Sequence, residues 1–206
     1  MTNGMLAYLT EEQRARAASA CVGIAGAGGL GSNAAMMLAR CGVGTLVLVD
    51  GDVVEPSNLG RQQYFPRHVG RAKVEALAEQ LLDLRPELRL VLHRAWLDKD
   101  NVERYLQEAD LWLEALDAPE AKALFASAAL RTGKPVICAS GMGGFSGRAM
   151  TRRILHGPRS LMAVVGDGHA DVAQFPPLAP RVAQCAAMQA DAALEYLFTQ
   201  NIKPLR

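Results

Sequence analysis

Short apolar runs alternate with amphipathic segments through the first two thirds of the chain, and this alternation restricts the fold more than any other feature. The apolar runs cover residues 21–25, 45–49, 88–93, 110–115 and 135–139. Segments with helical spacing lie between them, at residues 32–40, 71–84, 99–107 and 119–131. Strands separated by helices of this length form βαβ units with covered parallel sheets. We therefore expect an α/β, Rossmann-like, mainly parallel sheet with helices on both faces.

The pattern changes in the last third of the chain, where we expect a C-terminal antiparallel extension. Residues 148–155 and 160–165 have the pattern of two paired strands. A proline-rich crossover follows at residues 175–180, and a final helix at residues 181–199. No linker or repeat interrupts the chain, so we expect a single domain over residues 1–206.

Composition and charge narrow the class of function. The 206 residues are 50% apolar and 21% charged, and 22 basic against 21 acidic side chains give a net charge of +1. This balance disfavours nucleic-acid and membrane-surface binding. No apolar run reaches the roughly 18 residues that span a bilayer, and no secretory signal is visible, so we expect a cytoplasmic protein.

A glycine-rich motif lies between the first apolar run and the helix that follows it. Residues 26–31 read GAGGLG, which satisfies G-x-G-x-x-G. Glycines in this context allow a tight turn and let backbone N–H groups approach phosphate. Asp50 ends the second apolar run, 19 residues after Gly31, where an acid can bind ribose hydroxyls. The pair indicates an adenine nucleotide. A redox dinucleotide enzyme has the same pattern, and glycines that serve only a turn are a further alternative.

The segment after Asp50 favours a triphosphate over a redox dinucleotide. It reads DGDVVEPSNLGRQ over residues 50–62, and VGRAK follows at residues 69–73. An arginine and a lysine beside a glycine loop, here Arg61 and Lys73, can neutralise the phosphates as pyrophosphate leaves. Taken alone, each is as readily explained as a solvated charge, one on a loop and one on a helix.

These residues give the chain a specific family resemblance. It resembles the ThiF/MoeB/ubiquitin-activating superfamily, in particular its short ThiF-type adenylyltransferases for the sulfur carrier ThiS. The matching blocks are GIAGAGGLGSN, VLVDGDVVEPSNLGRQ, VGRAK, LWLEALDAPEAK and LAPRVAQCAAMQADAALEYL. The resemblance implies one adenylation domain over residues 1–206, with a nucleotide-binding half at about 20–140 and a crossover and carrier-binding extension at about 141–206.

The resemblance also implies ATP and Mg²⁺ as ligands and gives roles to single residues. The nucleotide would be held by Asp50, on the ribose, and by the loop glycines Gly26, Gly28, Gly29 and Gly31. The phosphates would be contacted by Ser57, Asn58, Arg61 and Lys73. Asp117 would hold Mg²⁺, so the expected catalytic residues are Arg61, Lys73 and Asp117. The alternative role of Asp117 is to cap the helix that follows it.

The activity implied by the resemblance is ATP-dependent adenylylation of a protein carboxylate. The C-terminal glycine of a ubiquitin-like, ThiS-like sulfur carrier would become an acyl-adenylate, in the pathway to the thiazole of thiamine. Three alternatives stay open. They are the same chemistry on a molybdopterin-type, MoaD-like carrier, a Rossmann oxidoreductase that binds NAD or FAD, and a non-catalytic scaffold of the same fold.

Three features depart from the family pattern. The paired C-x-x-C motifs of many relatives are absent, because the cysteines lie far apart, at positions 21, 41, 138 and 185, so we expect no zinc. Relatives often begin with Arg-Tyr-x-Arg-Gln, which supplies an arginine to a neighbouring subunit; here Arg14 or Arg16 is the candidate. Gly60 stands where a polar residue is usual, so we expect one contact on the phosphate side to be absent.

The last helix bears on assembly and on thiol chemistry. We expect a homodimer, because family members pair and this helix carries an apolar face with Leu194, Leu197 and Phe198. The alternative places that face in the chain's own core. Cys185 shares helical spacing with apolar neighbours, which favours a packed thiol over a nucleophile that forms a covalent link with the carrier.

Overall fold

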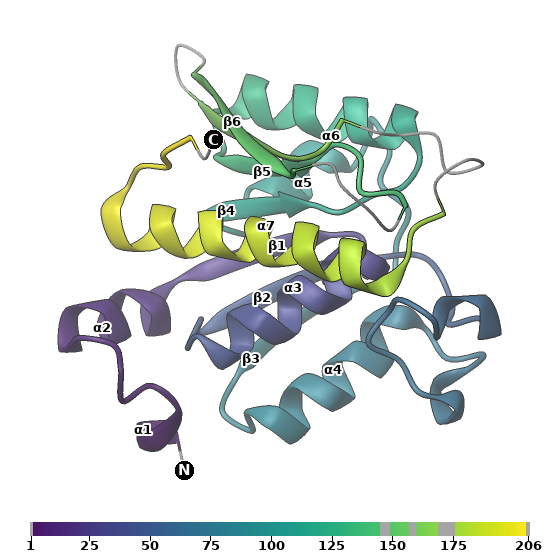
Figure 1. Ribbon diagram of the computed structural model, residues 1–206, viewed down its shortest axis with the longest axis horizontal. Helices are drawn as coiled ribbons and strands as arrows, with labels where there is room; N and C mark the ends of the chain where they lie inside the picture. Colours follow the sequence, from purple (N-terminus) through teal and green to yellow (C-terminus); the bar gives the residue numbers. More distant parts are fainter. Residues whose placement is uncertain (1, 145–148, 157–159, 169–175, 205–206) are drawn as a thin grey trace.

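Seven strands form one sheet in the computed structural model, which describes residues 2–144, 149–156, 160–168 and 176–204. The sheet has the order β3-β2-β1-β4-β5-β7-β6 (Figure 1). The strands are β1 (Cys21–Ala25), β2 (Thr45–Val49), β3 (Arg89–His93), β4 (Leu111–Glu114), β5 (Val136–Ala139), β6 (Thr151–His156) and β7 (Leu161–Gly166). Neighbouring strands are parallel except β6, which pairs antiparallel with β7. The predicted parallel sheet with an antiparallel extension is confirmed.

Helices cover both faces of the sheet (Figure 1). One face is covered by α3 (Gly29–Arg40), α4 (Lys73–Leu84) and α7 (Ala179–Thr199), and the other by α5 (Val102–Leu106) and α6 (Pro119–Thr132). Leu46 and Leu48 of β2 pack in the apolar core under α3, α4 and α7. Val47 and Val49 pack in the core on the other face, under α5 and α6. Both sides of the strand are therefore buried, which explains its unbroken apolar run. In the described part of the chain, no helix is long and apolar enough to cross a membrane.

Several boundaries differ from the prediction for local reasons. α3 begins at Gly29 rather than at residue 32, because Gly28 is its N-cap and the end of the glycine motif forms its first turn. α5 is shorter than the predicted 99–107, because the side chain of Asp98 accepts hydrogen bonds from the N–H groups of Asp100 and Asn101 and holds a turn there. α7 begins at residue 179, with Pro180 in its first turn.

Two further differences concern the ends of the chain. The helices α1 (Thr2–Met5) and α2 (Glu11–Ser19) were not predicted. α2 is stabilised by a capping box, in which Thr10 and Gln13 bond reciprocally across its first turn. The segment has no apolar stripe, so helical periodicity did not predict it.

Two predicted segments begin outside the described residues. They are the strand predicted at 148–155 and the crossover predicted at 175–180, whose first residues the structure does not describe.

The glycine motif lies where the chain reverses its direction across the sheet. β1 is followed by β2 and β3 on one side, and the chain returns to β4 on the other side of β1. Ligands bind at this kind of switch point in open α/β sheets. Gly26 has φ +99°, and a Cβ there would lie 2.6 Å from the carbonyl oxygen of Ala115. A Cβ at Gly31 would lie 1.8 Å from the carbonyl oxygen of Gly26.

Replacement of Gly31 by alanine tests this close packing. We expect Gly31→Ala to lower the free energy of unfolding by about 3 kcal/mol, because backbone atoms cannot move aside for the methyl group. Alanine is the better helix former by only about 1 kcal/mol, which does not offset the clash. Chemical denaturation measures the difference.

Gly60→Ala is the matched control. A Cβ at Gly60 would meet nothing within 4 Å. Its free energy of unfolding should be unchanged or raised by up to about 1 kcal/mol. Equal stability of the Gly31 and Gly60 variants would contradict the packing described for the motif.

Candidate functional site

The carboxylate of Asp50 joins the glycine loop to the segment after β2. Its Oδ2 accepts a hydrogen bond from the N–H of Ala27 at 2.6 Å, and its Oδ1 accepts one from the N–H of Asp52 at 2.7 Å. The N–H of Asp50 donates to the carbonyl of His93 at the end of β3. Each carboxylate oxygen can accept a second hydrogen bond, so ribose hydroxyls can bind Asp50 without detaching the loop.

Lys73 begins α4 and is buried beside this segment. Its side chain is 8% exposed, and Nζ lies 2.7 Å from Oδ2 of Asp52. The N–H of Lys73 also donates to the carbonyl of Asp52. Burial of an ammonium group is costly unless it is paired, so Asp52 holds the lysine in its place. The interpretation of Lys73 as a solvated helix charge is wrong.

Tyr64 connects the glycine loop to Lys73, and the sequence did not single it out. Its hydroxyl donates to the carbonyl of Ala27 at 2.7 Å and lies 3.3 Å from the carbonyl of Lys73. Burial, together with the nearby carboxylates of Asp50 and Asp52, raises the pKa of Tyr64, so the hydroxyl stays protonated. Spacing gave no signal for this residue, because its role depends on contacts between distant segments.

Arg61 lies against the other side of the glycine loop. A Cβ at Gly29 would lie 3.7 Å from Cγ of Arg61, so the arginine stem packs on the loop. Asn33 of α3 fixes this arrangement, because its Nδ2 donates to the carbonyls of Gly29 at 2.6 Å and Arg61 at 3.1 Å. The guanidinium donates to the carbonyl of Ser57 at 3.1 Å. Arg61 therefore contacts the glycine loop directly, whereas Lys73 is linked to it through the hydroxyl of Tyr64 and its own main-chain carbonyl.

Ser57 and Asn58 form a short turn, η1 (Pro56–Asn58), before Arg61. The buried carboxamide of Asn58 accepts from the N–H of Glu55 at 3.1 Å and donates to Oγ of Ser57 at 3.3 Å. Ser57 is exposed, and its hydroxyl lies 3.3 Å from Oε2 of Glu55. Asn58 thus shapes the turn that carries Arg61, and contact of either residue with phosphate stays a prediction.

Asp117 lies exposed in the turn between β4 and α6. Its Oδ1 accepts a hydrogen bond from the N–H of Ala118 at 2.8 Å. The N-cap of α6 is Ala118, without a side-chain cap, so the interpretation of Asp117 as a helix cap is wrong. Among the described residues, no three His, Cys, Asp or Glu side chains form a metal cluster. Mg²⁺ bound to nucleotide often takes a single carboxylate with phosphate oxygens and water, and one exposed carboxylate fits that mode.

A buried ion pair supports the turn that carries Asp117, and the sequence did not reveal it. Glu114 is 1% exposed, and its Oε1 lies 2.9 Å from Nζ of Lys122. The same Oε1 accepts from the N–H of Leu116, whose carbonyl accepts from Lys122. The pKa of Glu114 lies above its usual value, because the effect of burial exceeds the opposing effects of Lys122 and the backbone donors. The pair holds the backbone of the turn on both sides of Leu116.

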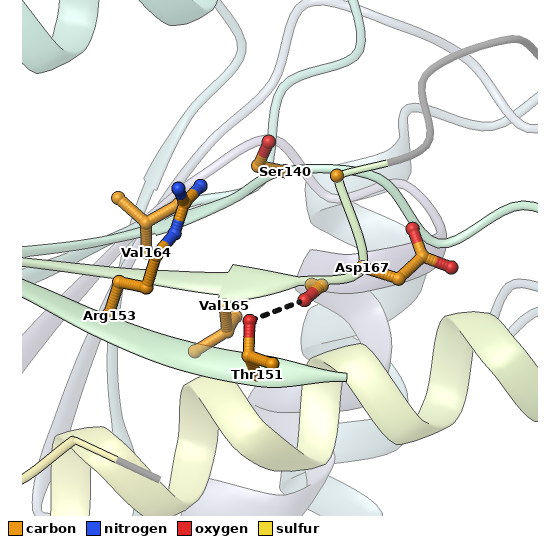
Figure 2. A pocket seen from close by; sticks show the side chains of 8 residues that line it. Ser140, Thr151, Arg153, Val164, Val165 and Asp167 are labelled. Atoms are coloured by element: carbon orange, nitrogen blue, oxygen red, sulfur yellow. Dashed lines mark hydrogen bonds between the residues drawn. The ribbon is translucent and has the colours of Figure 1, made fainter. Parts of the chain in front are cut away.

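One cavity adjoins Arg61, and another lies at the ends of β5 and β7. The first, of about 360 Å³, lies between residues 59–63 and the start of α7, and it is lined by Asn33, Leu59, Gly60, Arg61, Gln62, Gln63, Ala179, Pro180 and Ala183. Within the described ranges, the buried Oε1 of Gln62 has no hydrogen-bond partner. Figure 2 shows the second, of about 220 Å³, at the ends of β5 and β7, with Arg153 and Asp167 on its wall and a hydrogen bond from Thr151 to the carbonyl of Gly166. The first cavity adjoins the glycine loop through Arg61.

Comparison with known proteins identifies the family. The model of the ThiF family matches residues 2–205. The chain belongs to the ThiF family. In this ThiF-family chain, 125 residues are 43% identical to the adenylyltransferase and sulfurtransferase uba4 of Aspergillus niger, and they cover 60% of this chain and 26% of that protein. UBA4 of Candida glabrata is 36% identical over 121 residues, which are 58% of this chain and 28% of that protein. The chain spans about a quarter of the length of these relatives.

Solved structures share the fold of this ThiF-family chain. The tRNA N6-threonylcarbamoyladenosine dehydratase TcdA of E. coli, in complex with ATP, has a TM-score of 0.86 and 23% identity, covering 97% of this chain and 94% of that chain. E. coli MccB with ATP has a TM-score of 0.70 and 22% identity, covering 94% of this chain and 65% of that chain. At these identities the likeness concerns the fold.

The last helix of this ThiF-family chain packs on its own sheet. Cys185 is fully buried, and burial raises the pKa of its thiol to about 12, which confirms the packed interpretation. Leu197 is buried in the same core, and Leu194 and Phe198 pack partly buried against it, so these three belong to the intramolecular core. The homodimer stays a prediction.

The two candidate arginines near the start contact their own segment. The guanidinium of Arg14 donates to the carbonyls of Leu9 and Leu6. Arg16 pairs with Glu12 at 2.9 Å. Delivery of either arginine to a neighbouring subunit stays a prediction. Gly60 leaves open space at its Cβ position and lies on the wall of the cavity beside Arg61, and the absent contact on the phosphate side stays a prediction.

Replacement of Asp50 by asparagine tests the link between the loop and β2. We expect Asp50→Asn to lower the free energy of unfolding by about 1–3 kcal/mol, because the amide keeps one acceptor and turns an N–H₂ group toward a backbone N–H. Chemical denaturation in the absence of nucleotide measures this. The matched control is Asp117→Asn, which is exposed and should change stability by less than about 0.5 kcal/mol. A fully stable Asp50 variant would show that the loop does not depend on the carboxylate.

Proposed function

We propose that this chain is an ATP-dependent adenylyltransferase that activates the C-terminal carboxylate of a ubiquitin-like sulfur carrier. A carboxylate oxygen of the carrier attacks the α-phosphorus of ATP, and the bond from this phosphorus to the bridging oxygen of the β-phosphate breaks. The products are a carrier acyl-adenylate and pyrophosphate. The names of the uba4 relatives, which join adenylyltransferase with sulfurtransferase, support a sulfur carrier.

The observation that carries the proposal is that Arg61 and the buried Lys73 lie on segments that both contact the glycine loop. Arg61 packs on Gly29, and Lys73 is buried behind the loop through Tyr64 and Asp52. A dinucleotide oxidoreductase explains the glycines and Asp50 but gives no reason to bury a lysine there. A triphosphate does, because negative charge gathers on the leaving pyrophosphate and fixed cations stabilise it.

Each residue then has a definite task. Asp50 binds the ribose and keeps the loop open to the phosphates, and the first turn of α3 offers its free N–H groups to them. Arg61 and Lys73 bind the β- and γ-phosphates and hold the charge that develops on them. Asp117 would hold Mg²⁺, which supplies further charge neutralisation at the phosphates. No protein nucleophile is needed, which agrees with the inert, buried thiol of Cys185.

The finer identity of the carrier rests on resemblance alone. We infer a ThiS-like carrier in thiamine thiazole synthesis as the first candidate and a MoaD-like carrier as the second. Homodimer formation and a cytoplasmic location belong to the same inference. The balanced net charge of +1 favours a protein carrier over a polyanion such as tRNA.

ATP–pyrophosphate exchange in the presence of candidate carriers tests the proposal. We expect exchange that requires the intact terminal glycine of one carrier. Arg61→Ala and Asp117→Ala should reduce it by about 100-fold or more, because each removes charge stabilisation in the transition state. Arg131→Ala is a matched control, since this exposed arginine pairs with Glu103, far from the loop, and should leave exchange unchanged.

Two results would contradict the proposal. Carrier-independent binding of NAD or FAD without any exchange would favour an oxidoreductase. Near-normal exchange in a folded Arg61 or Asp117 variant would remove that residue from the reaction.

A further inference from the structure

Trp96 lies in the loop after β3 and is 70% exposed. A single exposed aromatic side chain is common and needs no functional explanation. The backbone around Trp96, however, is firmly held. Ala95 and Leu97 pack partly buried in the core under α5 and α6. The carbonyl of Trp96 accepts from Nδ2 of Asn101 at 2.9 Å. The loop therefore presents the indole to solvent in a fixed position.

The indole covers the residue that follows Asp50. A Cβ at Gly51 would lie 2.7 Å from three atoms of the Trp96 ring. Gly51 thus leaves space that any other side chain would fill, and the ring lies on its backbone. One side of the indole contacts this backbone, and much of the remainder faces solvent beside the proposed ribose site.

The order of the strands places this ring at one end of the nucleotide site. β1, β2 and β3 are neighbours and parallel, so the segments after them lie in a row at the carboxyl edge of the sheet. The glycine loop follows β1, Asp50 follows β2, and Trp96 lies in the loop after β3. With the phosphates of ATP at the glycine loop and its ribose at Asp50, the adenine base extends toward the loop after β3.

We propose that Trp96 stacks on the adenine ring of ATP and forms the wall of the base site. The inference rests on the proposed function, because it takes the positions of phosphate and ribose from it. Stacking of a base on an aromatic side chain adds affinity and tolerates different bases. Trp96 therefore contributes to nucleotide affinity, and the cations at the loop carry the phosphate contacts.

The chain's two tryptophans make the contact measurable in the full-length protein. Trp112 is fully buried, so fluorescence typical of solvated indole comes from Trp96. We expect ATP to quench this emission, with a midpoint equal to the Kd from calorimetry. Inorganic triphosphate, which has no base, should bind without quenching it.

Substitution gives the second readout. Trp96→Ala should raise the Kd for ATP about tenfold and leave the Kd for inorganic triphosphate unchanged, and Trp96→Phe should recover most of the affinity for ATP. Tyr8→Ala is the matched control. Tyr8 is 98% exposed and lies in the N-terminal segment, which packs at the opposite, amino edge of the sheet, where Leu6 contacts Gly42. It should leave both Kd values unchanged.

The outcomes separate the two proposals. ATP binding by the wild type without quenching, and with equal affinity in Trp96→Ala, would overturn the base contact and leave the proposed function standing. Trp96→Ala that binds ATP normally but binds the carrier more weakly would assign the indole to the protein partner instead, and would also overturn it. Failure of the wild type to bind ATP would contradict the proposed function and the base contact together.

Discussion

The hydrogen bond from the N–H of Ala27 to the carboxylate of Asp50 connects the two segments on which the site depends. The glycine loop follows β1, and the acidic segment follows β2. The second oxygen of Asp50 holds the N–H of Asp52, whose carboxylate pairs with Lys73. The proposed phosphate and ribose sites and the position of Lys73 are therefore linked through one side chain.

Two of the charged side chains around the site are removed from solvent. Lys73 and Glu114 are both buried, and each is paired with one opposite charge, Asp52 and Lys122 respectively. Such pairs contribute little net stability, because desolvation offsets their attraction. They do fix positions. Asp52 holds Lys73 in place, and Glu114 holds the turn before Asp117, so the proposed nucleotide-binding groups have fixed supports.

Much of the architecture could be predicted, because the central strands β1, β2, β4 and β5 are buried on both faces and their apolar runs are nearly continuous. β2 has the predicted bounds, and Asp50 and Asp117 follow strands at the expected edge. The glycine loop, Arg61 and Lys73 could also be singled out, because the local sequence fixes the place of each relative to a strand or a helix.

The rest depends on contacts between distant segments. The role of Tyr64 rests on the carbonyls of Ala27 and Lys73, and periodicity cannot show such a contact. The same holds for Asn33, which joins Gly29 to Arg61. α2 was missed because its formation rests on a capping box rather than an apolar stripe.

The most direct test of the account is mass spectrometry of a carrier protein incubated with this chain, ATP and Mg²⁺. We expect the carrier to gain one AMP group at its terminal glycine and pyrophosphate to be released in equal amount. Deletion of the terminal glycine should abolish both. Carriers that stay unmodified while the chain binds ATP and hydrolyses it, or leaves it intact, would contradict the account.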